Sequence, residues 1–546
     1  MRKMLFSLVA LFVGIASICA QDPSEMQLPL DPEVRVGKLD NGMTYYIRHN
    51  EKPKGQASFY IYHDVGAIQE DDDQQGLAHF LEHMAFNGTK NLPDKQIIEK
   101  LETIGVQFGN NLNAFTSWDC TQYMVMDLPV TEENVDLALL ILHDWSQFIA
   151  LQPEEIDSER GVIMEELRTR DGASLRAQND MIRNLFKGTL YEHRNLIGYL
   201  DGLKSFDQEA LVNFYKKWYR PELQALVIVG DIDVDQVESK IKTLMADIPA
   251  SPADAAQKVM HYVPATEQPI VSIFSDPEMT QSSVMMFARR DALPKEYNNT
   301  IVGYSFNLIK SFVSIMMNER FEDISKSANA PFLGGGMSEG SIGICPTMES
   351  TMFSATAHEG RIDEAFRAMY TEMERMRRYG FTAGEFERAK QEILRWAERS
   401  YTNRNDVSNA EYAQRYLDNY ADGSPMMDAE TEWQLDQMFI NSLTVEQVNE
   451  AYAQMATPNK NLVILARSPK KEGVVIPTEE QLLAIIAEVE ASEIAPYEDN
   501  TVIEPLVDPA QKFKGAKVAN VETNESLGYT EWTLKNGIKV VVRPST

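Results

Sequence analysis

The chain has 546 residues, of which 44% are hydrophobic and 24% are charged, and its formal net charge at pH 7 is −31. This composition is that of folded globular proteins and excludes an intrinsically disordered chain. The length predicts several domains rather than one. The acidic balance repels phosphate backbones, which excludes nucleic acid as a partner.

The N-terminus has the pattern of a secretory signal peptide. Two basic residues precede an apolar run from Met4 to about Ile18, and the small residue Ala20 ends the segment. We therefore predict a cleaved signal peptide over residues 1–20, a secreted or periplasmic protein, and no transmembrane segment after cleavage. Lipoprotein anchoring through Cys19 is the less favoured alternative.

The first half of the chain mixes hairpins with helices. Residues 34–48 predict a β-hairpin with a tight primed turn at Asn41-Gly42. The other predicted elements are a strand at 57–65, helices at 76–86 and 97–104, an extended segment at 116–127, helices at 133–149 and 153–170, and a strand at 225–229. This order favours an α+β domain, over residues 30–255, rather than regular βαβ winding.

A second unit follows over residues 265–468. Its predicted elements are a strand at 270–275, helices at 300–323 and 361–379, and a strand at 461–466. Residues 470–528 are rich in Pro, Glu and Ala, and they predict a linker arm with one helix at 479–490.

The end of the chain repeats a pattern from its beginning. The segment from Leu39 to Arg48 and that from Leu534 to Arg543 both place Leu-x-Asn-Gly before a β-rich run and an arginine. Such repetition is typical of repeated domains. Residues 529–546 therefore predict the start of a truncated third domain, with chance similarity of two Asn-Gly hairpins as the alternative.

The motif with the clearest chemistry lies in the predicted helix 76–86. It reads Gly76-Leu-Ala-His79-Phe-Leu-Glu82-His83. Residues three and four apart share a helix face, so both histidines can bind one metal ion while the glutamate lies beside them. This is the inverted zinc-peptidase order, in which the glutamate activates water. The alternative is a surface helix that happens to carry two histidines.

A catalytic zinc ion needs a third protein ligand, and the candidates lie on the helix predicted at 153–170. Glu159 and Glu166 are seven residues apart and share one face. Glu165 points about 100° away from its neighbour, so only one of the adjacent pair can face the metal. By itself, this segment favours an acidic surface helix over a metal ligand, because such helices are common.

Together these segments resemble the pitrilysin family of zinc peptidases, which includes insulysin and the mitochondrial processing peptidases. The resemblance is strong from Gly76 to Thr89 and from Glu159 to Glu166, and fainter in the second unit. The gap between the two motifs is several residues longer than usual, which predicts a loop insertion.

The resemblance implies roles for individual residues. His79, His83 and Glu166 would bind Zn²⁺, Glu82 would be the general base, and Glu159 would support a ligand as a second catalytic carboxylate.

It also implies a substrate-binding strand. Asn113 and Ala114 resemble the family's edge strand, which binds an extended peptide through main-chain hydrogen bonds. An ordinary amphipathic strand is the alternative. The implied fold is two similar domains of mixed or antiparallel sheet packed with helices, the first catalytic and the second not. A missing C-terminal half, or a second copy of the chain, would close the chamber.

The chain departs from the family pattern in one respect. The family's last domain carries an Arg and, seven residues on, a Tyr that hold the substrate carbonyl, whereas the comparable stretch here offers Ser325 and Phe332. We expect a zinc-dependent endopeptidase, with a peptide-binding half-enzyme that is inactive without its C-terminal half as the alternative. A non-catalytic assembly subunit is a remote third reading, because the motif residues are intact.

The remaining motifs are weaker. The spacing of Cys120 and Cys345 leaves open whether they form a disulfide. The run Gly334–Gly336 predicts a flexible loop rather than a phosphate cradle, since no lysine and hydroxyl follow it. Six histidines lack partners at metal spacing and are interpreted as structural or surface residues: His49, His63, His143, His193, His261 and His358.

Overall fold

The computed structural model describes residues 26–499, 507, 510–512 and 514–544, so the predicted signal peptide lies outside the described residues. The chain divides into two units, Met1–Tyr497 and Glu498–Thr546, which are described separately. In the described part of the chain, no helix is both long and apolar enough to cross a membrane.

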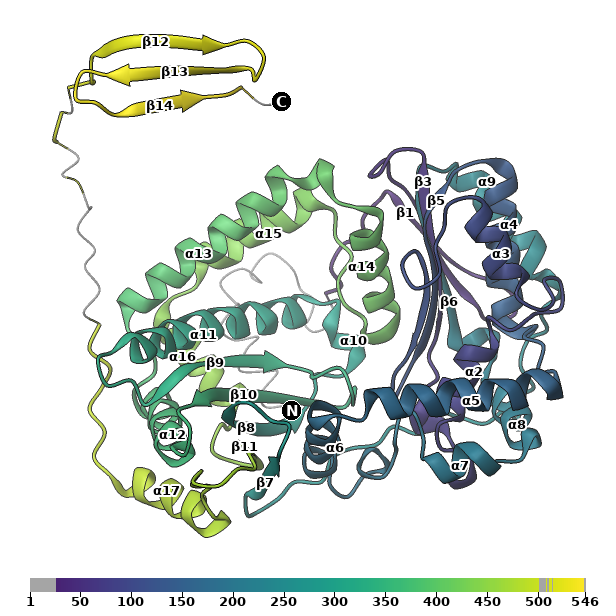
Figure 1. The fold of residues 1–546 in the computed structure, drawn as a ribbon, viewed down its shortest axis with the longest axis horizontal. Coiled ribbons are helices and arrows are strands. Elements are labelled where there is room, and N and C mark those ends of the chain that lie inside the picture. The colour runs from purple at the N-terminus through teal and green to yellow at the C-terminus, as the bar shows by residue number, and fades with distance from the viewer. Residues whose placement is uncertain (1–25, 500–506, 508–509, 513, 545–546) are drawn as a thin grey trace. The chain divides into compact units, whose positions relative to one another are not determined.

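A six-stranded sheet organises the first half of the larger unit (Figure 1). Its strand order is β1-β2-β6-β3-β5-β4, and β2 pairs in parallel with β6 while the other neighbours are antiparallel. The strands are β1 (Val34–Lys38), β2 (Thr44–His49), β3 (Gln56–His63), β4 (Leu112–Thr116), β5 (Thr121–Pro129) and β6 (Gln224–Gly230). Strand β4 is therefore a free edge of the sheet.

Two details of this sheet differ from the sequence prediction. The turn between β1 and β2 is not primed, because Gly42 has a positive φ of 98° whereas Asn41 does not. The Gly42 amide donates to the Leu39 carbonyl at 2.9 Å, as in a type I turn followed by a glycine in the left-handed conformation. The segment predicted as extended at 116–127 is strand β5 from Thr121 onward, but it begins with the turn between β4 and β5, where Ser117 N donates to Cys120 O.

Helices cover one face of this first sheet. They include α2 (Leu77–Met84), α3 (Gln96–Thr103), α4 (Glu132–Gln147), α5 (Pro153–Arg170), α7 (Leu200–Ser205), α8 (Gln208–Trp218) and α9 (Val234–Leu244). Helix α6 (Ala173–Leu185) packs instead on strands of the second half, where its Leu185 shares a buried cluster with Phe287 and Leu465. Helix α4 begins where Thr131 caps the Asn134 amide, and α5 begins with Pro153 in its first turn. The fully buried Trp145 of α4 donates from Nε1 to the Ala85 carbonyl at 3.0 Å, directly after α2, so core packing anchors the candidate metal helix.

The second half contains a five-stranded sheet with the order β7-β11-β8-β10-β9. Its strands are β7 (Ile270–Asp276), β8 (Ser282–Asp291), β9 (Phe332–Gly340), β10 (Met348–Ala357) and β11 (Leu462–Pro469). Strand β7 pairs in parallel with β11, and the other pairs are antiparallel. This arrangement repeats β2-β6-β3-β5-β4 of the first sheet, so the chain is α+β with two domains of matching topology, as predicted.

The helices of the second half include α11 (Ile301–Lys326), α12 (Ile362–Tyr379), α13 (Ala383–Thr402), α14 (Asn409–Asp422), α15 (Ala429–Ser442), α16 (Val445–Met455) and α17 (Glu479–Ala491). Helix α11 joins β8 to β9, just as α2 and α3 join β3 to β4. Helix α13 likewise takes the place in chain order that α5 has in the first half.

Two segments of the second half differ from the predictions. The glycines predicted as a flexible loop lie in edge strand β9, where a Cβ on Gly335 would be 2.8 Å from Phe321 Cδ1 and one on Gly336 would be 2.7 Å from Asn318 Oδ1. They allow helix α11 to approach the strand closely. Helix α17, placed in the linker arm, contributes Leu482 and Val489 to the second core, so residues 470–497 belong to the larger unit.

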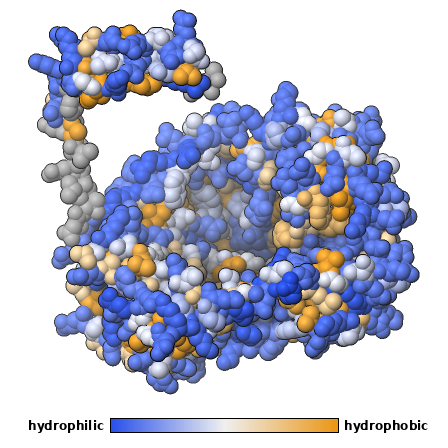
Figure 2. Space-filling view, in the orientation of Figure 1, coloured by the Kyte–Doolittle hydropathy of each residue, from blue (hydrophilic) through white to orange (hydrophobic). Residues whose placement is uncertain are grey.

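Helix α14 crosses from the second half onto the first sheet (Figure 1). Its Tyr416 stacks on Tyr46 of β2 with ring centroids 5.8 Å apart. The guanidinium of Arg48 lies 3.8 Å from the ring centre of Tyr412, which is also on α14. Both faces of the first sheet are thus covered, which explains why β6 is buried along its whole length. Figure 2 shows a hollow near the centre of the face in view.

The smaller unit is a three-stranded antiparallel sheet of β12 (Val518–Asn524), β13 (Tyr529–Leu534) and β14 (Lys539–Val542). Its predicted Asn-Gly hairpin joins β13 to β14, with Gly537 at a φ of 87°. The sheet begins eleven residues before the predicted boundary of 529, at Val518.

Candidate functional site

The helix that carries the metal motif is anchored at its N-terminus by a buried carboxylate. Glu70, 3% exposed, accepts hydrogen bonds from Gly76 N at 3.1 Å and from Ala78 N at 2.9 Å. Its own backbone carbonyl accepts from Arg194 Nη2 at 2.7 Å. A carboxylate is favourable at a helix N-terminus, where unpaired amides gather. Sequence analysis missed this residue, although an acidic residue shortly before a helix is a recognisable signal.

Three potential ligands converge beside this helix. His79 and His83 of α2 and Glu166 of α5 place one donor atom each so that all lie within 4.8 Å of one another. His79 Nε2 is 3.7 Å from Glu166 Oε1, and His83 Nε2 is 3.2 Å from Glu166 Oε2. Two imidazoles and a carboxylate form the donor set of many catalytic zinc sites, so these residues fit Zn²⁺.

The adjacent glutamates of α5 face in different directions, as their helical spacing requires. Glu165 is 58% exposed at its side chain and pairs with Arg168, whereas Glu166 is 20% exposed and faces the histidines. Arg170, one turn further along, places Nη2 2.6 Å from Glu166 Oε1. The structure therefore brings Glu166, and not its neighbour, to the candidate metal site.

Glu159 lies behind His83. Its Oε1 is 2.8 Å from His83 Nδ1, and its Oε2 accepts from Asn87 Nδ2 at 2.5 Å. Because the Nδ1 atom is engaged, the Nε2 atom of His83 is left to face Glu166. This is the arrangement in which a second carboxylate fixes the orientation and tautomer of a metal-binding histidine.

Glu82 lies on the same helix, between the two histidines in sequence. It is 8% exposed, and its Oε2 accepts a hydrogen bond from Thr116 Oγ1 at 3.1 Å. The same oxygen is 3.9 Å from His79 Nε2, which places the carboxylate beside the candidate ligands without making it one of the converging set.

Burial and the nearby carboxylates shift the titration of these groups in opposite directions. Burial raises the pKa of Glu82 to about 7 and lowers the pKa of His79 to about 4. Burial also opposes the charged form of His83, but its hydrogen bonds to Glu159 and Glu166 outweigh this and raise its pKa to about 9. The site therefore favours a positive charge between its carboxylates.

The predicted substrate strand is β4, the free edge of the first sheet. Asn113 is exposed, Ala114 is half-buried, and the Ala114 amide donates to Asn113 Oδ1 at 2.9 Å. Thr116 at the end of the same strand reaches Glu82, so the open edge runs directly to the candidate site.

Ser325 and Phe332 stand where the sequence comparison looked for the family's Arg and Tyr, and neither side chain is free to bind a substrate carbonyl. Ser325 donates to the Glu322 carbonyl within helix α11, and Phe332 is fully buried in the second core.

Two of the other histidines are buried, His193 lies at the surface, and His49 belongs to a second group of possible ligands. His63 is fully buried, which lowers its pKa to about 3, and His143 lies between Asp144 and Asp247. His49, however, lies near Glu51 and Asp231 with donor atoms within 4.8 Å of one another. Sequence spacing missed this group because Asp231 belongs to a distant part of the chain. It is largely exposed, and Lys54 pairs with Glu51 at 3.1 Å.

Neither described cysteine forms a disulfide. Cys120 and Cys345 are both free, and burial raises the pKa of each thiol. This resolves the alternative that the sequence left open.

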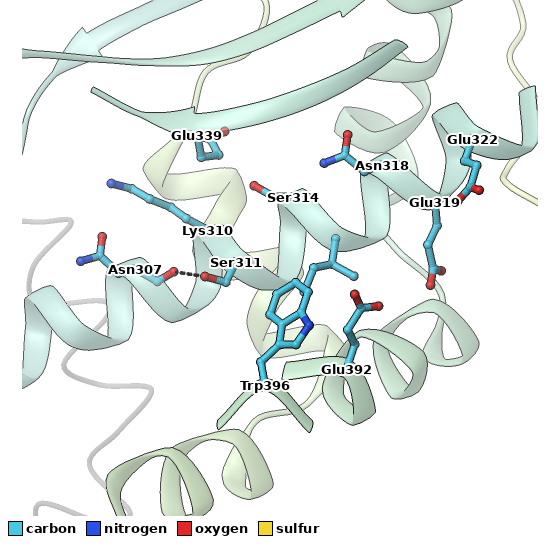
Figure 3. A pocket seen from close by; sticks show the side chains of 11 residues that line it. Asn307, Lys310, Ser311, Ser314, Asn318, Glu319, Glu322, Glu339, Glu392 and Trp396 are labelled. Atoms are coloured by element: carbon cyan, nitrogen blue, oxygen red, sulfur yellow. Dashed lines mark hydrogen bonds between the residues drawn. The ribbon is translucent and has the colours of Figure 1, made fainter. Parts of the chain in front are cut away.

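A cavity of about 630 Å³ lies between helices α11 and α13 of the second half (Figure 3). Because α11 and α13 correspond in chain order to the helices that carry the first-half motif, this cavity occupies the matching place in the second domain. Its lining includes Lys310, Glu319, Glu392 and Trp396, and none of these belongs to a converging metal-ligand group among the described residues. In the described part of the chain, the comparable place in the second half thus lacks the converging histidines and glutamate of the first.

Comparison with known families connects the first half to peptidases. The family model described as insulinase (peptidase family M16) matches residues 45–194, and the one described as the peptidase M16 inactive domain matches residues 205–300.

Curated relatives carry zinc-protease names. The probable zinc protease PqqL of Escherichia coli (strain K12) is 29% identical over 78% of this chain and 45% of that protein. The protein of the same name from Haemophilus influenzae is 27% identical over 85% of this chain and 50% of that protein. The chain thus spans about half the length of these relatives.

Solved structures share the fold. The crystal structure of the first half of the periplasmic protease PqqL from Escherichia coli has a TM-score of 0.78 and 26% identity, covering 87% of this chain and 100% of that chain. The structure of whole PqqL has the same TM-score and identity, covering 95% of this chain but 56% of that chain.

Proposed function

Because the chain carries domains of the insulinase peptidase family M16, we propose that it is a zinc-dependent endopeptidase that hydrolyses peptides or unfolded polypeptides. The observation that carries this proposal is the convergence of His79, His83 and Glu166 within 4.8 Å, with Glu82 beside them. The zinc-protease names of the relatives support it. We further propose a secreted or periplasmic location, in keeping with the N-terminal sequence pattern.

In this proposal His79, His83 and Glu166 hold Zn²⁺, and Glu159 keeps His83 turned so that its Nε2 faces the metal. The ion supplies Lewis acidity, which lowers the pKa of water and polarises a peptide carbonyl. Glu82 accepts the proton of the attacking water and then delivers it to the departing amine. The burial that raises the pKa of Glu82 to about 7 suits a group that takes and returns a proton near neutral pH.

Substrate would bind as an added strand on the open edge of β4. Asn113 and Ala114 would offer main-chain groups to an extended peptide, and the Asn113 side chain would first release the Ala114 amide. Because this recognition uses backbone groups, it tolerates many sequences, which fits unfolded polypeptides better than one specific peptide.

A second candidate is a peptide-binding half-enzyme that needs a C-terminal half or a second copy for turnover. It is favoured by the coverage of the relatives, since this chain matches 56% of whole PqqL. The absence of a carbonyl-binding pair at Ser325 and Phe332 points the same way, since Phe332 is buried.

The test is hydrolysis of a long, flexible fluorogenic peptide by the chain, beside the Glu82→Gln variant. Cleavage that is inhibited by a chelator and abolished in the variant would support the endopeptidase. No cleavage by either protein, with one zinc ion still bound, would favour the half-enzyme. Absence of both cleavage and zinc binding would overturn the metal assignment.

A further inference from the structure

We infer that Thr116 is a positioning residue for Glu82, which ties one carboxylate oxygen so that the other is left to accept the proton of water. This inference rests on the proposed function and deepens it, because it assigns to the edge strand a second task besides binding peptide.

The contact itself is buried and well defined. Thr116 Oγ1 donates to Glu82 Oε2 at 3.1 Å, and each residue is 8% exposed. It is the one hydrogen bond to this carboxylate among the described residues. At 3.1 Å the bond is longer than a short charge-assisted one, so its role is to orient the carboxylate.

The hydroxyl is held by its surroundings. Thr116 pairs with Thr121 of β5 at the end of β4, and the turn that follows is closed by the bond from Ser117 N to Cys120 O at 2.7 Å. Threonine is β-branched, so its side chain is stiff once its backbone is fixed. The donor therefore presents a fixed direction to a carboxylate whose own side chain has several rotatable bonds.

This arrangement ties the general base to the substrate strand. Asn113 and Ala114, where peptide is proposed to bind, lie three and two residues before Thr116 on the same strand. Because the hydroxyl is fixed on β4, a peptide that pairs with this strand would bind in a constant position relative to Glu82. One strand would then position both the substrate and the general base.

The experiment compares three variants of the chain. Thr116→Val removes the hydroxyl at nearly constant volume, and Thr116→Ser restores it. Thr121→Val is the matched control, because Thr121 is 1% exposed on the neighbouring strand and its hydroxyl donates to the Val65 carbonyl instead. We measure kcat and KM for peptide hydrolysis, the zinc dissociation constant, and the crystal structure of each zinc-loaded variant.

Thr116→Val is expected to lower kcat about tenfold, the effect of losing one hydrogen bond to a charged group. KM and zinc affinity should stay within about twofold of the parent, and Thr116→Ser should regain most of kcat. In the Thr116→Val crystal the Glu82 carboxylate should adopt more than one orientation, whereas it should stay fixed in Thr121→Val.

Three results would overturn the inference: unchanged kcat in Thr116→Val, an equal loss in Thr121→Val, or a Glu82 carboxylate that stays in place without the hydroxyl. A parent chain that binds zinc without cleaving peptide would count against the proposed endopeptidase alone. The orientation of Glu82 in the crystals would then decide the role of Thr116 by itself.

Discussion

Glu159 Oε1 lies 2.8 Å from His83 Nδ1, although the two residues are 76 positions apart in the chain. This contact joins helix α5 to helix α2 at the point where the proposed zinc ligands meet. The carboxylate holds the imidazole from behind, while Glu166 approaches its other nitrogen at 3.2 Å. One helix thus supplies both a candidate ligand and the group that orients another.

Replacing this orienting carboxylate should weaken metal binding without unfolding the protein. We expect Glu159→Gln to raise the zinc dissociation constant about 10- to 100-fold, because His83 loses the charge that fixes its tautomer. Competition with a chromogenic chelator measures this. Glu154→Gln, at an exposed position in the first turn of the same helix, should leave zinc affinity unchanged. Equal zinc dissociation constants in the two variants would show that Glu159 does not support metal binding.

The adjacent glutamates of α5 offer a matched pair for identifying the third ligand. Glu166→Gln should reduce bound zinc well below one ion per chain, because the amide is a poor substitute for a carboxylate ligand. Glu165→Gln should retain full zinc content, since that side chain is 58% exposed and pairs with Arg168. Atomic absorption after dialysis distinguishes the two. The reverse result would mean that α5 binds with its other face.

The turn that starts the motif helix requires glycine. Gly76 has a φ of 90°, and a Cβ there would be 2.7 Å from Gly198 Cα and 2.8 Å from the Ile197 carbonyl oxygen. We expect Gly76→Ala to lower the free energy of unfolding by about 1–3 kcal/mol, through backbone strain and this clash.

The matched control is Gly161→Ala, in the middle of helix α5, where a Cβ meets nothing within 4 Å. It should raise the free energy of unfolding by about 0.5–1 kcal/mol, because alanine is the better helix former. Urea unfolding followed by circular dichroism measures both. If Gly76→Ala were as stable as the parent, the left-handed start of α2 would not be required.

A buried histidine should make stability depend on pH. Burial opposes the charge of His143, but its bonds to Asp144 at 2.9 Å and Asp247 at 2.8 Å raise its pKa above the ordinary value of about 6.5. Folding therefore favours the protonated form. This contribution is fully present below the unfolded-state pKa, and it is lost as the pH rises through the higher folded-state pKa.

The measurement is the thermal unfolding midpoint between pH 6 and pH 9, for the parent and His143→Gln. The parent should lose stability with rising pH more steeply than the variant. His193→Gln, whose side chain is 70% exposed, should follow the parent. If the unfolding midpoints of the parent and His143→Gln changed with pH in parallel, the protonated His143 and its two aspartates would add no stability.

Local patterns predicted much of the fold. The helices that carry the motif residues form close to where periodicity and Pro153 predicted them, and the Asn-Gly hairpins form at both ends of the chain. The type of the β1–β2 turn and the conformation of the glycine run were not predicted correctly. The Gly334–Gly336 run reads as a loop in isolation, but pairing with β10 and the approach of α11 make it a strand.

What the sequence determined by itself is the chemistry that spacing along one helix fixes. His79, Glu82 and His83 share α2, and Glu159 and Glu166 share one face of α5, because 3.6 residues per turn decide both. Only the tertiary structure decided which distant groups meet: Thr116 at Glu82, Glu159 at His83, and Asp231 at His49. These contacts come from sheet order and helix packing, which no local periodicity encodes.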